Sequence, residues 1–172
     1  KAVKGDDNIQ VLPVATATTR VLRMRVDLEP WTDARVRNAL KMCQNREKIL
    51  ALAYQGEGLQ GQDFHVYPKH PEYCDMPIPD YQPDKAKKLL AEAGYPDGVD
   101  VSIAVGSEWT DVVRYAEVLK QDALPGGFRI NIQTMPTSQY WEKWTEVDLG
   151  VTPWTHRPLG TMVLSLGYTA DG

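Results

Sequence analysis

The segment over residues 81–98 holds the start and stop signals of one short helix, and it constrains the fold more than any other stretch. Pro83 lacks the amide hydrogen that would be unpaired in a first helical turn, and Asp84 places a carboxylate at the positive end of the helix dipole. Gly94 supplies a left-handed cap, and a turn follows it. The pattern predicts a helix from Pro83 and then a strand over 99–105.

Apolar residues recur at three- and four-residue spacing along this helix, which predicts one buried face. These residues are Ala86, Leu89, Leu90 and Ala93. A second pattern of this kind predicts one long helix that begins at Thr32 or Asp33 and ends near Tyr54. Its inward residues are Val36, Ala39, Leu40, Cys43, Leu50 and Ala53.

Runs of β-branched and aliphatic residues predict further strands, and amphipathic stretches between them predict further helices. The strands are expected at 11–17, 21–26, 129–135 and 149–154, the helices at 110–124 and 138–144, and another strand-like run ends before residue 168. Alternation of strands and helices predicts an α/β domain with a partly parallel sheet covered on both faces. Residues 55–80 form an irregular loop longer than the usual limit of about 12–15 residues, so we expect it to serve a purpose.

The composition fits one soluble globular domain over residues 1–172, because 42% of the residues are hydrophobic and 24% are charged. Nineteen basic and 23 acidic residues give a net charge of −4, and no run of Lys or Arg could follow a phosphate backbone. We therefore expect no nucleic-acid partner. No stretch approaches the roughly 18 consecutive apolar residues of a membrane span, so we expect no membrane insertion.

Several possible sites for chemistry have weak support in the sequence. Cys43 and Cys74 permit one disulfide, but we favour two free thiols, with Cys43 on a buried helix face. His65, His70 and Cys74 have spacings that fit no standard zinc ligand pair, so we expect solvated histidines and no metal. The G-x-G-x-x-G motif at 56–61 follows a helix, which favours a flexible turn over a nucleotide site. With no recognisable nucleophile motif, we expect no catalytic residue and no cofactor.

Four sequence blocks together resemble the family 5 extracellular solute-binding proteins of ABC importers, the dipeptide- and oligopeptide-binding group. They are an aspartate with R-V-R-x-A-L at 33–40, an N-R-E-x-I block at 45–49, the Gly-rich loop, and the tyrosine-led segment from residue 81. The resemblance covers nearly the whole chain. Asn45 and Gln82 stand where the family usually has aspartates, which we expect to weaken local helix capping.

The resemblance implies one lobe of a type II periplasmic binding protein fold, excised from a two-lobe protein because both ends of the chain look cut. It implies a non-enzymatic function in which a small-molecule or peptide solute is captured between this lobe and the first lobe of the same chain. The solute then passes to the transmembrane subunits of an ABC permease. The implied location is periplasmic or extracytoplasmic, with or without a lipid anchor. The alternative is the ligand-sensing domain of a transcription regulator with the same fold.

The cluster Trp154, Thr155, His156 and Arg157 is the strongest candidate for a ligand site. An indole at a strand end gives a flat apolar surface, and a charge beside it can fix ligand orientation. The alternative is a half-buried Trp with a solvated Arg. The resemblance implies an aspartate at the place of Arg157, pairing with the α-ammonium group of a peptide. The Arg157 guanidinium is positive where that aspartate would be negative, which predicts a ligand with a carboxylate, a phosphate or several hydroxyls.

Other candidate residues follow two of the predicted strands. Trp109 lies where ligands of open α/β sheets usually bind, although it could instead cover the start of a helix. Of the pair Tyr140 and Trp141, we expect Tyr140 to face the cleft and Trp141 to lie in the core. Glu108 is included because it could pair with Arg157 and frame the ligand site. Trp31 and Trp144 are expected to serve packing.

Overall fold

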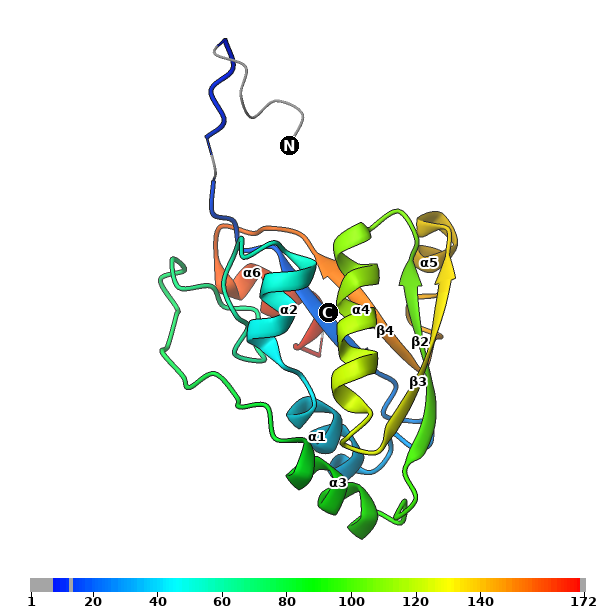
Figure 1. Ribbon diagram of the computed structural model, residues 1–172. Helices are drawn as coiled ribbons and strands as arrows, with labels where there is room; N and C mark the ends of the chain where they lie inside the picture. The colour runs from blue at the N-terminus through cyan, green and yellow to red at the C-terminus, as the bar shows by residue number, and fades with distance from the viewer. Residues whose placement is uncertain (1–7, 13, 171–172) are drawn as a thin grey trace.

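A four-stranded sheet in the order β1-β4-β2-β3 organises the molecule (Figure 1). The computed structural model describes residues 8–12 and 14–170. Its strands are β1 (Thr19–Met24), β2 (Val99–Gly106), β3 (Phe128–Met135) and β4 (Leu149–Trp154). β2 runs parallel to β3 and β4, whereas β1 pairs antiparallel with β4 at the sheet edge. The prediction of a partly parallel sheet in an α/β domain is therefore confirmed.

Helices cover the sheet mainly on one face. They are α1 (Ala34–Met42), α2 (Arg46–Ala53), α3 (Pro83–Glu92), α4 (Thr110–Ala123), α5 (Thr137–Lys143) and α6 (Gly160–Gly167). In Figure 1, α4 crosses the sheet with α2 beside it, and contacts of α4 with β2, β3 and β4 accompany this arrangement. α1 packs against α3, away from the carboxyl ends of the parallel strands.

The predicted helix over 33–54 is two helices, because the chain breaks between α1 and α2. The Asn45 side chain accepts a hydrogen bond from the Lys48 amide at 3.0 Å and starts α2. Asparagine is a strong N-cap, so the expectation that it weakens capping was wrong. The break rotates the buried face: Ile49 is buried, whereas Leu50 is only partly buried. Gln82 makes no side-chain cap bond at α3, as expected.

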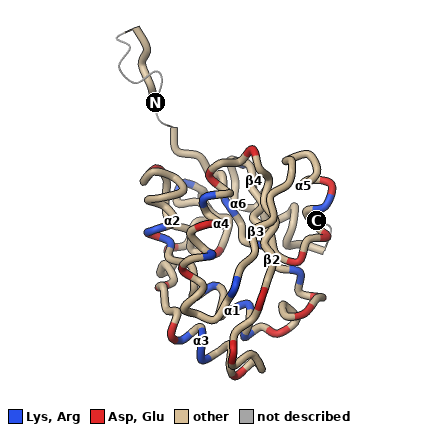
Figure 2. The backbone as a smooth tube through the Cα atoms, turned by 45° about the vertical axis from the view of Figure 1, so that its right-hand side comes forward, with Lys and Arg blue, Asp and Glu red and all other residues tan. Residues whose placement is uncertain are grey.

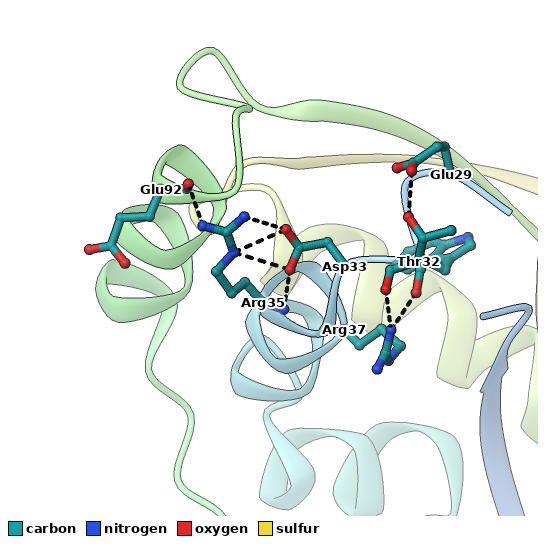
Figure 3. Close-up of polar contacts among 7 residues, drawn as sticks. Glu29, Thr32, Asp33, Arg35, Arg37 and Glu92 are labelled. Atoms are coloured by element: carbon teal, nitrogen blue, oxygen red, sulfur yellow. Dashed lines mark hydrogen bonds and ion pairs between the residues drawn. The ribbon is translucent and has the colours of Figure 1, made fainter. Parts of the chain in front are cut away.

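Figure 3 shows the start of α1, where the R-V-R block has a structural role. The Asp33 carboxylate accepts from the Arg35 amide at 2.7 Å and also pairs with the Arg35 guanidinium, which lowers the pKa of Asp33. Arg35 donates a further bond to the Glu92 carbonyl at 2.8 Å, at the end of α3. Arg37 donates to the Trp31 carbonyl at 2.6 Å. These contacts fasten α1 to α3 and to the preceding turn.

The sequence prediction is accurate for α3 and for the core that it joins. Ala86 and Leu90 are buried against the core, and Gly94 has the left-handed φ of +103° expected at the cap. Trp31 is buried and stacks on Phe128, with ring centroids 6.5 Å apart, so its packing role is confirmed. The core therefore lies between the helices and one face of the sheet.

Three of the predicted strands differ from the structure. The described residues of the stretch at 11–17 form no strand, and the strand expected at 21–26 begins at Thr19 instead. The strand-like run before residue 168 is helix α6. Its first amide, from Gly160, donates to the Glu72 carboxylate at 3.1 Å, which satisfies a helix start that the apolar run alone does not reveal.

The second face of the sheet is covered only in part, by α5, by α6 and by the loop over 55–80. On β2 and β3 this face carries exposed polar residues, so the expectation of two covered faces is correct for only part of the sheet. These residues are Asp100, Ser102, Arg129 and Asn131. Basic and acidic residues are interspersed along the chain and are spread over the fold (Figure 2). Within the described residues, no helix is both long and apolar enough to cross a membrane.

Candidate functional site

The carboxyl ends of β2, β3 and β4 gather at one edge of the sheet, together with the start of β1. Ligands of open α/β sheets usually bind at such an edge. β2 and β4 pair only at Ala104 and Gly150, so beyond this point the two strands are not joined. The starts of α4 and α5 lie at the same edge (Figure 1). Of the seven predicted ligand-binding residues, Tyr140 lies inside α5, and the other six lie at the end of β4, in the segment that follows it, or in the turn between β2 and α4.

Trp154 closes β4 and is partly buried on the second face of the sheet. Its ring lies 4.9 Å from the His65 ring, centroid to centroid. A side chain at Gly167 of α6 would come within 3.0 Å of the indole. The indole is thus wedged between the long loop and α6. Thr155 and His156 follow it in exposed positions, and His156 Nδ1 accepts from the Ala17 amide at 3.1 Å.

Arg157 is folded back on its own segment. Its Nη1 donates to the Thr155 hydroxyl at 2.7 Å and to the His156 carbonyl at 3.1 Å. No carboxylate among the described residues lies within ion-pair distance of the guanidinium. Because both described bonds use Nη1, the Nε and Nη2 donors form an open edge of the kind that binds a carboxylate in two parallel bonds.

Glu108 does not frame Arg157, because its carboxylate is occupied at the start of α5. It accepts from the Thr137 amide at 2.7 Å and from the Thr137 hydroxyl, and from the Ser107 hydroxyl at 3.2 Å. The bonds from Thr137 are the main cause that lowers the pKa of Glu108 to about 2. Glu108 thus joins the β2–α4 turn to the start of α5. The alternative that pairs Arg157 with Glu108 is wrong in this structure.

An aromatic cluster lies on the other side of the edge, with Trp109 at its centre. Trp109 is partly buried and meets Tyr140 and Trp141 edge-on, at centroid distances of 5.5 and 5.4 Å. Trp141 also meets Trp144 at 6.1 Å, and Arg23 lies 5.7 Å from the Trp144 ring centroid, which fits a packing role for Trp144.

The expected orientations of Tyr140 and Trp141 are reversed. Tyr140 is fully buried and its hydroxyl bonds to the Thr152 hydroxyl at 2.8 Å. It fits there because Gly150 has no side chain: a Cβ at Gly150 would lie 2.8 Å from the Tyr140 oxygen. Trp141 is 43% exposed. Trp109 and Trp141, rather than Tyr140, therefore offer an aromatic surface at the edge.

Two histidines of the long loop are buried, which the sequence did not predict. His65 lies against Trp154, with its Nδ1 3.1 Å from the Thr19 hydroxyl and its Nε2 2.9 Å from the Tyr168 hydroxyl. His70 bonds to the backbone of Tyr67 and Arg157. Both are buried, so the expectation of solvated histidines was wrong. Burial lowers the pKa of His65. The unusual length of the loop was the one sequence signal that pointed to such anchoring.

The structure also describes the potential metal ligands, the two cysteines and the Gly-rich motif. Within the described residues no group of three or more potential metal-ligating side chains is found. Both cysteines are free, Cys43 buried and Cys74 exposed. Burial raises the pKa of the Cys43 thiol to about 12, which makes it inert at neutral pH. The Gly-rich motif closes the end of α2, where the Gly56 amide donates to the Leu50 carbonyl at 3.0 Å.

The fold has close counterparts among solved structures. It matches NikA from Staphylococcus aureus in complex with Ni(L-His)2 with a TM-score of 0.84, 21% identity, and coverage of 99% of this chain and 37% of that one. A dipeptide-binding protein from Pseudoalteromonas sp. SM9913, in complex with Met-Leu, matches with a TM-score of 0.81 and 24% identity. That match covers 90% of this chain and 32% of the other. At these identities the likeness concerns the fold.

Relatives found by sequence are also binding proteins. Heme-binding protein A from Haemophilus influenzae is 26% identical over 162 residues, which are 89% of this chain and 29% of the relative. The glutathione-binding protein GsiB from Escherichia coli is 26% identical over 138 residues, covering 80% of this chain and 27% of the relative. The chain thus spans less than a third of the length of these relatives. The model of the bacterial extracellular solute-binding proteins, family 5 (middle) matches residues 1–170. The chain belongs to this family.

Proposed function

We propose that the chain is a ligand-contacting lobe of an ABC-importer solute-binding protein, and that Arg157 binds an anionic or polyhydroxylated group of the solute. The observation that carries the proposal is the open Nε–Nη2 edge of Arg157, which has no described acidic partner. At the same edge of the sheet, Trp109 and Trp154 are partly exposed and supply apolar surface. A few polar groups beside aromatic walls are typical of small-molecule sites.

The ligands named for relatives and structural neighbours support an anionic group. Heme, glutathione and the dipeptide Met-Leu each carry at least one carboxylate, although they differ greatly in size. A buried guanidinium facing only an ammonium group would be costly, so a free amino terminus is a poor partner for Arg157. The solute is therefore expected to present a carboxylate, a phosphate or several hydroxyls to this lobe.

The proposed transport mechanism also involves a first lobe, a hinge and a membrane permease. The solute bridges this lobe and the first lobe, a hinge closes, and the closed form docks on the permease in an extracytoplasmic compartment. The family consists of solute-binding proteins and not of enzymes, which supports a binding role without catalysis. The alternative as a sensing domain of a transcription regulator has no comparable support.

A thermal-shift titration of the full-length protein tests the role of Arg157. The probes are N-acetyl-Met-Leu with a free carboxylate and the same peptide as its carboxamide, alongside a free-amino Met-Leu amide. A ligand at a hundredfold its Kd adds about 2.7 kcal/mol to the free energy of unfolding, which raises Tm measurably. We expect the carboxylate probe to raise the Tm of the wild type most, and we expect Arg157→Asp to lose that shift.

Lys120→Glu is the matched control, because Lys120 is exposed in the last turn of α4, a helix about 20 Å long that starts at the candidate ligand edge. Like Arg157→Asp it replaces a positive charge by a negative one, but far from Arg157, and it should leave the shift unchanged. If the free-amino peptide stabilises wild type and Arg157→Asp equally, and the carboxylate probe has no advantage, the anionic assignment is wrong.

A further inference from the structure

The loop over 55–80 returns to the end of β4. There it contacts residues 154–160, the ligand segment, at three successive points. His65 packs on Trp154, His70 bonds to the backbone of Arg157, and Glu72 accepts from Gly160 at the start of α6. The contacts therefore run in the same order along the loop and along the ligand segment. This regular correspondence suggests that the loop fixes the shape of the segment and does not merely cover it.

The contact at His70 is the most specific of the three. His70 Nδ1 accepts from the Tyr67 amide at 2.9 Å, and its Nε2 lies 2.9 Å from the Arg157 carbonyl oxygen. A carbonyl can only accept, so Nε2 carries the proton and donates, while Nδ1 is bare. His70 is buried, with 5% of its surface exposed. One imidazole thus links a turn of the loop to the residue that carries the proposed anion contact.

The Arg157 side chain is held as well, by its own segment. Its Nη1 donates to the Thr155 hydroxyl and the His156 carbonyl, so the guanidinium has a fixed position only if the backbone at 155–157 is fixed. Arg157 has no described acidic partner that could fix it instead. Losing the His70 bond to the Arg157 carbonyl would therefore move the guanidinium donors that bind the solute. Donors that are held in place before binding raise affinity, because less freedom is lost when the solute binds.

We propose that His70 is a positioning residue for the solute site: its hydrogen bond to the Arg157 carbonyl holds the guanidinium in its binding orientation. The proposal rests on the proposed function of Arg157. The loop then affects ligand affinity through the backbone of Arg157. The described contacts of His70 include no side chain of the ligand segment.

Two substitutions separate the two bonds of the imidazole. His70→Asn keeps an acceptor near the Nδ1 position for the Tyr67 amide but is too short to reach the Arg157 carbonyl. His70→Gln places an amide donor near the Nε2 position and keeps that reach. In the full-length protein without ligand, we expect faster amide hydrogen exchange over 155–159 in His70→Asn than in wild type. We expect His70→Gln to restore much of the protection.

Calorimetric titration with N-acetyl-Met-Leu gives the second readout. Because a hydrogen bond of this kind contributes modestly, we expect His70→Asn to raise Kd about three- to tenfold and His70→Gln to raise it less. In an Arg157→Gln background the effect of His70→Asn should disappear, since His70 acts through Arg157. A merely structural role would weaken binding equally in both backgrounds.

The outcomes distinguish this proposal from the proposed function. If Arg157→Gln weakens binding but His70→Asn changes neither exchange nor Kd, the positioning role is overturned and the anion contact stands. If Arg157→Gln leaves Kd unchanged, the anion contact is overturned and His70 loses its role in affinity. Unchanged exchange over 155–159 in His70→Asn overturns the positioning role without any ligand.

Discussion

Glu108 and Arg157 were both predicted to serve the ligand site, and the difference between them lies in what their charged groups contact. The Glu108 carboxylate accepts from the Thr137 amide and hydroxyl, which leaves it committed to the start of α5. The Arg157 guanidinium contacts only its own segment and keeps an open edge. From the sequence both charges look available, because a hydrogen-bond partner 29 residues away, such as Thr137 for Glu108, is not visible in the local pattern.

Acid titration of Glu108→Gln tests the helix-cap role of Glu108. The hydrogen bonds from Thr137 lower the pKa of Glu108 to about 2, below the ordinary value of about 4.3. A depressed carboxyl pKa stabilises the folded state above the unfolded-state pKa, and this stabilisation is lost as pH falls through the folded-state pKa. We expect the Tm of the wild type to decrease more steeply than that of Glu108→Gln between about pH 4.3 and pH 2.

The control for this measurement is Glu117→Gln, which removes an exposed carboxylate in the middle of α4. Its Tm should follow pH as the wild type does. Parallel Tm curves for Glu108→Gln and wild type over the same range would contradict the cap role.

At the scale of elements, the start of each helix depends on which residue supplies the first hydrogen bond. Asn45 caps α2 through its side chain, whereas Gln82 at the corresponding position of α3 makes no such bond. We expect Asn45→Ala to lower the free energy of unfolding by about 1 kcal/mol, and Gln82→Ala to change it little. Gln82→Asp should stabilise, because it supplies the missing acceptor. Urea unfolding of the four proteins measures these differences.

An equal loss of stability in Asn45→Ala and Gln82→Ala would contradict this interpretation. It would mean that the two positions act through packing or solvation and not through the capping bond. The m-values should stay equal among the variants, so that changes in midpoint report stability alone.

Sequence patterns predicted the elements whose signals are local. The Pro83 and Gly94 signals bound α3, and the apolar runs of β2, β3 and β4 locate the parallel strands to within one residue. The α1–α2 break was missed because an apolar stripe continues across it while one asparagine cap decides the boundary. α6 was read as a strand because its cap, Glu72, comes from a distant loop. The buried histidines depend on the same long-range packing.

At the scale of the whole molecule, the sheet separates a packed face from a second face that carries the candidate ligand edge. α4 and its neighbours bury one face, and the second face carries Trp154, Thr152 and the aromatic cluster near the carboxyl ends of the strands. Trp109 and Trp154 are partly exposed, and Trp141 is 43% exposed. The edge thus presents a surface, whereas small-molecule sites usually enclose most of the ligand.

This geometry predicts that the 172-residue chain alone binds solute more weakly than the full-length protein. In the proposed two-lobe arrangement this chain supplies only part of the enclosing surface, and losing contacts worth about 3 kcal/mol raises Kd about a hundredfold. Calorimetry with N-acetyl-Met-Leu should therefore give a Kd at least about a hundredfold higher for the isolated chain. Arg157→Gln should weaken whatever binding remains, because its open edge belongs to this lobe. Equal affinity of the two proteins would mean that the site lies wholly within this chain and that closure between two lobes contributes nothing to capture.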